Sequence, residues 1–311
     1  MRAFRCTVWT GGDAEPYDGC VVVEDGVVHL TDDAPGAVDA GWIQPGLYDA
    51  HVHLAFGTLE AMRAGGVLAV RDLGAPPHLA RQWRGPDVEV AGPLLTAPGG
   101  YPSNSWGADG FARFVATADE AREAVRDLDA DVVKVALEPA GGQPVPTPEV
   151  VAAIVTAAHA RGLQVTAHAL SEPMVERALD AGVDELCHTP AAPLSAGCIS
   201  RIAAAGIPVV STIETLGDAA PANARALHDA GVRLVYGTDL GNAGTTPGAD
   251  PRELRRLADA GLGAFGAIRA ATRERLTDGG PARLVVLAAN PRTDLGAWRA
   301  PVHVESGHGR T

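Results

Sequence analysis

Short β-rich runs alternate with alanine-rich stretches over most of the chain. Eight runs are rich in apolar and β-branched residues and predict strands at 49–54, 66–73, 88–96, 132–137, 163–169, 185–188, 207–212 and 233–239. Most of the stretches between them have a helical pattern, and several end in glycine just before the next strand, as helices often do. Strands that alternate with helices in this way predict βα units and a parallel sheet.

The number of these units indicates the fold. Eight βα units between residues 45 and 281 match a (β/α)8 barrel, whose typical length is about 250 residues. A doubly wound open sheet is the alternative, but no G-x-G-x-x-G motif follows an early strand. Residues 1–44 and 282–311 are again strand-like. We therefore expect an α/β protein: a (β/α)8 barrel with a small β-sandwich-like domain, built from both termini, flanking it.

Metal-binding or reactive side chains recur at the carboxyl ends of the predicted strands, where catalytic groups lie in such barrels. Five strands supply six of these groups: His51, His53, Lys134, His168, His188 and Asp239. In the H-x-H pair both imidazoles point to the same face of the strand. Each group alone is typical of a hydrogen-bonded core histidine or a turn aspartate. Their coincidence at strand ends indicates a metal site, and imidazole with carboxylate suits Zn, Mn or Fe(II).

The other histidines, among them His78 and His159, lie away from these strand ends, and we expect them to be structural or surface residues. Lys134 is the only lysine of the chain and lies in the apolar run VVKVAL. Burial disfavours the charged ammonium and makes the amine nucleophilic. The residues alone leave three roles open: a carbamate formed with CO₂, a Schiff-base lysine, or a lysine whose head reaches the barrel mouth.

Seven motifs in order resemble the amidohydrolase superfamily. They are QPGLYDAHVHL, GGVLAVRDLG, AGPLLTAPGGYPS, DADVVKVALEPAGG, HARGLQVTAHAL, RALDAGVDELCHTP and VYGTDLGN, and the closing PARLVVLAANPRTDL resembles the return strand of the flanking β-domain. The resemblance covers nearly the whole chain and is closest to the imidazolonepropionase-like and metal-dependent prolidase-like branch. The segment between the last two barrel strands is short for this branch. The residues that match the family's metal ligands are present, but the family's substrate specificity is not carried over to this chain.

The resemblance implies a binuclear metal centre. His51, His53 and Asp239 would hold the more buried ion, and His168 and His188 would hold the second. Lys134 would be carboxylated and would bridge the two ions. The cofactors would be two divalent transition-metal ions, Zn first, with Mn or Fe as alternatives. A metal-bridging hydroxide would attack the substrate, and Asp239 would act as the proton shuttle.

Charge and composition restrict the kinds of partner that the protein can bind. A net charge of −13 argues against nucleic-acid binding, and no apolar run is long enough to span a bilayer. The N-terminal stretch has no apolar core of the kind found in signal peptides, so we expect a cytoplasmic protein with a small-molecule substrate. The four cysteines, Cys6, Cys20, Cys187 and Cys198, fit no C-x-x-C motif, and we expect reduced thiols.

The predicted function is metal-dependent hydrolysis of a C–N bond in an amide, a cyclic amide, an N-acyl amino acid or a dipeptide. A lactonase or deaminase on the same metal site is an alternative, and so is a non-catalytic protein that kept the barrel as a scaffold. Three residues are candidates for substrate binding. Tyr101 and Trp106 follow the third strand, and Arg71 ends the second. Arg71 could pair bidentately with a substrate carboxylate, or equally with Asp72 or another acid of the protein.

Overall fold

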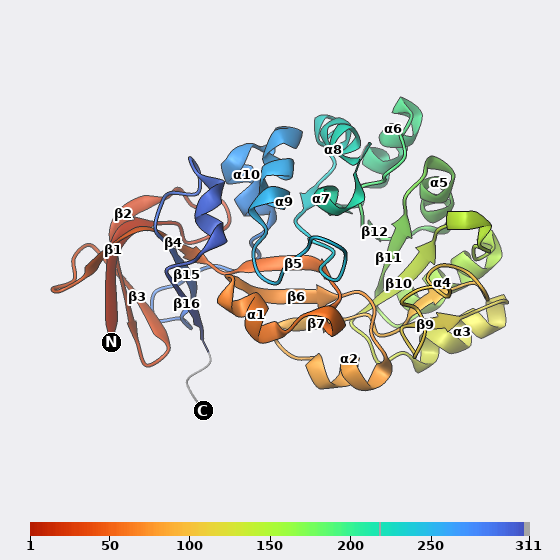
Figure 1. Ribbon diagram of the computed structural model, residues 1–311, viewed down its shortest axis with the longest axis horizontal. Coiled ribbons are helices and arrows are strands. Elements are labelled where there is room, and N and C mark those ends of the chain that lie inside the picture. Colours follow the sequence, from red (N-terminus) through yellow and green to blue (C-terminus); the bar gives the residue numbers. More distant parts are fainter. Residues whose placement is uncertain (218, 308–311) are drawn as a thin grey trace. The chain divides into compact units, whose positions relative to one another are not determined.

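The computed structural model describes residues 1–217 and 219–307 and contains the predicted (β/α)8 barrel (Figure 1). Its strands are β5 (Leu47–Val52), β6 (Val67–Asp72), β7 (Val88–Val90) followed by β8 (Leu94–Thr96), β10 (Val132–Leu137), β11 (Gln164–Ala169), β12 (Glu185–Leu186), β13 (Val209–Val210) and β14 (Leu234–Val235). The run 132–137 forms a strand over the predicted range. The last three strands each span only two residues.

Backbone hydrogen bonds close the strands into a ring. The sheet orders are β5-β6-β7 and β14-β13-β12-β11-β10-β8-β9, where β9 (Ala112–Phe114) is an additional strand. The first and last barrel strands join where Ala50 N–H donates to the Tyr236 carbonyl at 3.0 Å and Asp239 N–H donates to the His51 carbonyl at 2.8 Å. The third and fourth join where Asp131 N–H donates to the Val90 carbonyl at 2.8 Å. A closed ring brings the carboxyl ends of all eight strands to one rim.

Helices follow the strands, as the alternating pattern predicts. They are α2 (Pro77–Trp83), α3 (Ala118–Asp127), α4 (Pro148–Ala160), α5 (Glu172–Ala181), α6 (Ala196–Ala205), α7 (Ile213–Leu216) and α8 (Ala220–Asp229). The hydroxyls of Thr117, Thr147 and Ser195 cap α3, α4 and α6 by accepting backbone N–H bonds. Gly182 and Gly206 end α5 and α6 in the left-handed conformation.

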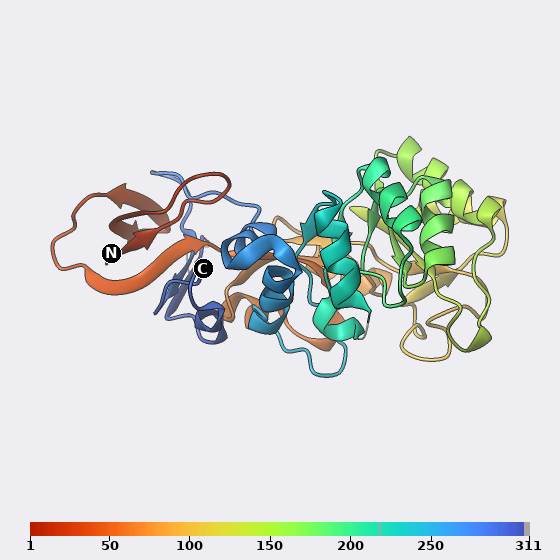
Figure 2. The ribbon, with the colours of Figure 1, turned by 90° about the horizontal axis from the view of Figure 1, so that it is seen from above.

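Neighbouring helices α3 to α6 pack against each other in chain order, and α8 packs against α6. Figure 2 shows part of this row, from teal α8 through green to yellow-green α4. The helices bury apolar faces: Val150, Val151, Ile154 and Val155 of α4 are all buried. Two short 3₁₀ turns, η1 (Leu54–Phe56) and η2 (Ala140–Gly142), follow strands β5 and β10. The helices pack along the outside of the strands, and the polar residues at the strand ends form the candidate site.

The chain ends contribute a separate sheet. It contains β1 (Arg2–Val8), β2 (Tyr17–Glu24), β3 (Val27–Thr31), β4 (Val38–Pro45), β15 (Arg283–Leu287) and β16 (His303–Ser306), in the order β16-β15-β4-β1-β2-β3. Buried Val8, Val21, Ile43, Leu284 and Val286 belong to its apolar core. The expected β-domain from both termini is therefore present, although residues 308–311 of the predicted range lie outside the described part. The boundaries 1–44 with 282–311, and 45–281, remain a prediction.

Contacts divide the chain into two compact units. One comprises Met1–Asp49, Gly57–Ala69 and Thr246–Thr311, and includes α1 (Leu59–Ala64), α9 (Pro251–Leu257), the π-helical turn η3 (Ala258–Leu262), α10 (Gly263–Ala270) and η4 (Leu295–Arg299). The other comprises Ala50–Phe56 and Val70–Thr245. Every candidate site residue lies in this second unit. Among the described residues, no helix combines the length and the apolar character that a membrane span requires.

Candidate metal centre

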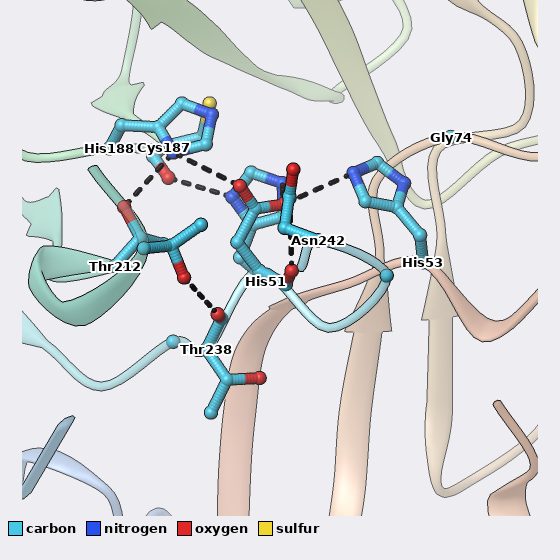
Figure 3. A network of polar contacts seen from close by, with 12 residues as sticks. His51, His53, Gly74, Cys187, His188, Thr212, Thr238 and Asn242 are labelled. Carbon is cyan, nitrogen blue, oxygen red and sulfur yellow. Dashed lines mark hydrogen bonds and ion pairs between the residues drawn. The ribbon is translucent and has the colours of Figure 1, made fainter. Parts of the chain in front are cut away.

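The first and last barrel strands bring three metal-binding side chains together. His51 and His53, at the end of β5, are 0% and 5% exposed, and Asp239 follows β14. Nε2 of each histidine lies 3.3 Å from Oδ1 of Asp239. In Figure 3 both imidazoles face the same central point. Their potential ligand atoms lie within 4.8 Å of one another, so one ion could contact all three side chains.

The buried polar atoms of this group fit a cation. Oδ1 of Asp239 is buried, and among the described residues no hydrogen-bond donor satisfies it. A buried carboxylate oxygen without a donor is costly, and a metal ion would satisfy it. Nitrogen and oxygen donors together suit Zn, Mn or Fe(II). The side chains of this group therefore fit a divalent metal ion.

His168 and His188 lie beside this group, from β11 and the end of β12. The His188 ring centroid is 4.5 Å from that of His51 and 4.7 Å from that of His168. Nδ1 of His188 lies 3.9 Å from Oδ2 of Asp239, and Nε2 of His168 lies 3.5 Å from Oε2 of Glu138. Four histidines and Asp239 thus converge at one rim of the barrel, although they are spread over nearly 190 positions of the sequence.

Lys134 reaches the same place from the middle of β10. The side chain is buried, with 3% of the residue exposed. Its Nζ donates a hydrogen bond to Sγ of Cys187 at 2.7 Å. Cys187 was not among the predicted site residues, although it directly precedes His188 in the motif ELCH. The lysine therefore points into the site, as expected, but its partner there is a thiol.

Burial keeps the imidazoles neutral. Desolvation lowers the pKa of His51 and of His188 well below the ordinary value. Desolvation also lowers the pKa of His168, although the carboxylate of Glu138 opposes the shift. Neutral imidazole is the form that binds metal, so these three rings need not lose a proton at neutral pH.

Surrounding residues fix the orientations of the candidate ligands. Nδ1 of His51 donates to the Cys187 carbonyl at 2.8 Å, which leaves Nε2 toward Asp239. Oγ1 of Thr212 lies 3.0 Å from Nδ1 of His188. Thr212 and Asp239 both hold a left-handed backbone, with φ of 42° and 54°. Such values are uncommon for residues other than glycine and often occur at functional sites.

Asp72 and Gly74 support His53. The carboxylate of Asp72 accepts N–H bonds from Leu54 at 2.7 Å and from Gly74 at 3.2 Å. A Cβ atom at position 74 would lie 3.2 Å from the His53 ring, so glycine makes room for that ring. From the sequence alone, Asp72 is predicted only as a potential partner of Arg71. Its bonds to two loops could not be read from the local motif.

Aromatic side chains enclose the centre. Tyr101 stacks on His168 with ring centroids 5.0 Å apart, and Trp106 lies 4.7 Å from the His53 ring. Trp106 Nε1 donates to the Tyr101 hydroxyl at 3.2 Å. Both rings therefore lie beside candidate metal ligands. With Phe56, Leu94 and Asn242, they help to line a cavity of about 30 Å³, which has room for very little beyond water.

Arg71 does not line this cavity. It is 4% exposed and forms an ion pair with Glu185, and its Nε donates to the Ala50 carbonyl at 3.0 Å. Glu185 also accepts from Thr166 Oγ1 at 2.7 Å. This contact supports the structural alternative for Arg71, an ion pair with an acid of the protein, over binding of a substrate carboxylate.

A barrel with histidines and an aspartate converging at its strand ends is the architecture of metal-dependent hydrolases. A model of the amidohydrolase family matches residues 42–274, and the chain belongs to this family. An uncharacterized protein of Mycobacterium tuberculosis is 28% identical over 85% of this chain and 83% of its own length. The superfamily that the seven motifs indicate is confirmed.

Solved structures share the fold. A Xaa-Pro dipeptidase with methionine bound in its active site matches with a TM-score of 0.80 and 20% identity, over 98% of both chains. A prolidase complexed with N-methylphosphonate-L-proline matches with a TM-score of 0.77 and 20% identity, over 99% of this chain and 98% of that one. These neighbours show that this chain shares their fold. The coarser functional prediction, a hydrolase of the metal-dependent amidohydrolase type, is supported by the family.

Proposed function

We propose that this protein is a binuclear metal-dependent hydrolase that cleaves the C–N bond of an amide, a cyclic amide or an N-acyl amino acid or dipeptide. The observation that carries the proposal is the convergence of four buried histidines, Asp239 and Lys134 at one barrel rim. His51, His53 and Asp239 would hold one ion. His168 and His188 would hold the second, with carboxylated Lys134 as the bridge.

When bound, the two ions would polarise the scissile carbonyl and lower the pKa of the attacking water toward neutrality. Asp239 has a second oxygen available for proton transfer. Its Oδ1 faces His51 and His53, whereas Oδ2 points toward His188, 3.9 Å from Nδ1. We assign to this carboxylate the transfer of a proton from the attacking water to the leaving nitrogen. Zn is the expected metal, with Mn or Fe as alternatives.

Tyr101 and Trp106 would bind the substrate. Their rings cover His168 and His53, so an acyl group that reaches the centre must contact them or displace them. The cavity of about 30 Å³ is smaller than a dipeptide needs. We therefore expect the segment that carries the two rings to move when substrate enters. The dipeptidase and prolidase named among the solved structures support the choice of an amide or dipeptide bond over other bonds.

Elemental analysis of purified protein tests the metal centre. We expect close to two transition-metal ions per chain after growth in metal-replete medium. Lys134→Ala and His168→Ala should lower that number, because each removes a ligand of the second ion. His78→Ala is the matched control, since His78 is exposed on α2 and should leave the metal content unchanged. Protein without bound metal would refute the binuclear proposal.

Hydrolysis assays separate the functions that share this site. Amide and dipeptide substrates should be turned over by the metal-loaded protein, and lactones and amidine or aminopurine compounds should not. Turnover of lactones alone would indicate a lactonase, and turnover of the amidine or aminopurine compounds alone would indicate a deaminase. A metal-loaded protein without turnover of any class would support the scaffold alternative.

A further inference from the structure

Cys187 is a buried thiol inside the site whose role the proposed ligand set does not explain. It is 0% exposed and lies between strand β12 and His188. Its backbone carbonyl accepts the hydrogen bond that orients His51, at 2.8 Å. Its sulfur accepts the hydrogen bond from Nζ of Lys134, at 2.7 Å. Both ends of this residue therefore contact residues that the metal site uses.

The position of the sulfur relative to the histidines fits a ligand. Cys187, His51 and His188 are all buried, and each offers a ligand atom within 4.8 Å of the other two. His51 belongs to the expected first ion and His188 to the expected second. The sulfur thus lies within reach of both parts of the centre.

We propose that Cys187 is a further ligand of the metal centre and that its thiolate makes this a site for a borderline-soft ion such as Zn²⁺ or Co²⁺. The inference rests on the proposed metal-dependent function and adds a ligand type to it. On binding, the S–H bond breaks and the proton leaves to solvent. The sulfur keeps the electron pair and uses it to form the metal–sulfur bond, with no change in oxidation state.

A thiolate changes the metal preference of the centre. Oxygen ligands suit Mg and Mn, whereas thiolate selects Zn and other soft or borderline ions. A hydrogen bond from Lys134 Nζ would reduce the charge density on the sulfur and orient it, as residues around metal ligands commonly do. A carbamate on Lys134 retains an N–H group, so this hydrogen bond is compatible with the carboxylated lysine.

Cys198 provides a matched control. It is also buried, at 1% exposure, in the same compact unit, but it lies on α6, and its backbone N–H donates to the Ser195 hydroxyl at 3.2 Å. It belongs to neither set of candidate metal-binding residues found among the described residues. Removal of its sulfur therefore tests the general effect of losing a buried thiol.

Optical spectra of cobalt-substituted protein test the inference. A cobalt–thiolate bond gives charge-transfer absorption in the near ultraviolet that nitrogen and oxygen ligands do not give. We expect this band in the wild type and in Cys198→Ser, and its loss in Cys187→Ser. Cobalt binding without the band in the wild type would overturn the thiolate ligand and leave the proposed function standing. Absence of cobalt binding in the wild type would instead count against the metal centre itself.

X-ray absorption of the zinc-loaded wild type gives an answer that needs no variant. We expect a sulfur neighbour at about 2.3 Å in addition to nitrogen and oxygen at about 2.0–2.2 Å. A first shell with only the lighter atoms would refute the inference. In that case Cys187 would serve only as a hydrogen-bond acceptor that positions Lys134, and Cys187→Ser should keep more bound metal than Cys187→Ala.

Discussion

Replacing Arg71 with methionine tests whether this residue is structural or binds substrate. Its guanidinium pairs with Glu185, and the two side chains are only 5% and 12% exposed. Methionine keeps much of the volume of the arginine stem but removes the charge. Glu185 would keep the hydrogen bond from Thr166 Oγ1 at 2.7 Å and lose its cation. The variant therefore leaves the largely buried carboxylate of Glu185 without the guanidinium that it pairs with.

The expected loss of stability is large. Removing one partner of a buried ion pair typically costs about 3–5 kcal/mol, because the remaining charge stays desolvated. For a chain of this size, such a loss lowers the melting temperature by on the order of 10 °C. Arg71→Met combined with Glu185→Gln should recover more than half of the loss, because the second change removes the uncompensated charge.

Thermal melts of the single and double variants measure this effect. Arg122→Met is the control, since Arg122 pairs with Asp119 at 59% and 95% side-chain exposure and should leave the melting temperature unchanged. An Arg71→Met single variant with the same melting temperature as the wild type would refute the structural role. If that variant also showed a raised KM for a carboxylate substrate and an unchanged kcat, Arg71 would be a substrate-binding residue.

Three further outcomes are expected. Asp239→Asn should lower kcat by about 10²–10⁴ fold in metal-loaded protein, because the amide cannot accept a proton; an unchanged rate at equal metal content would exclude the shuttle. Trp106→Ala should raise KM by about tenfold, equivalent to roughly 1.4 kcal/mol of lost contact, at unchanged metal content; loss of metal would point to a structural tryptophan. The melting temperature of chelator-treated protein should fall as the pH drops below about 6.5, the ordinary pKa of histidine. Burial lowers the folded-state pKa of His51, His168 and His188, so the unfolded chain binds more protons there; a flat profile from pH 8 to 5 would contradict this.

The barrel and the candidate metal ligands could be predicted because each leaves a local signal. The run VVKVAL forms β10 over the predicted residues, and its pattern needs no knowledge of the neighbouring strands. Histidines at strand ends are similarly visible. Their convergence follows once the strands are parallel, since parallel strands place their carboxyl ends at one rim.

Contacts across the barrel interior could not be predicted in the same way. Lys134 and Cys187 are 53 positions apart, and Arg71 and Glu185 are 114 apart. Which side chains meet depends on the stagger of the closed sheet, and a shift of one residue would turn each to the opposite face. The sequence therefore left an ion pair as one of two roles for Arg71, and gave no signal that a thiol would meet the lysine.

The left-handed backbone of Thr212 has a consequence for attempts to make this protein more heat-resistant. A β-branched residue in that conformation, with φ of 42°, costs about 1–2 kcal/mol relative to glycine. Thr212→Gly would relieve this strain, and a search for stabilising substitutions could select it. The same substitution removes the hydroxyl 3.0 Å from Nδ1 of His188. Selection for thermal tolerance alone would thus favour variants in which His188 has lost this hydrogen bond, so such screens should measure metal retention as well as melting temperature.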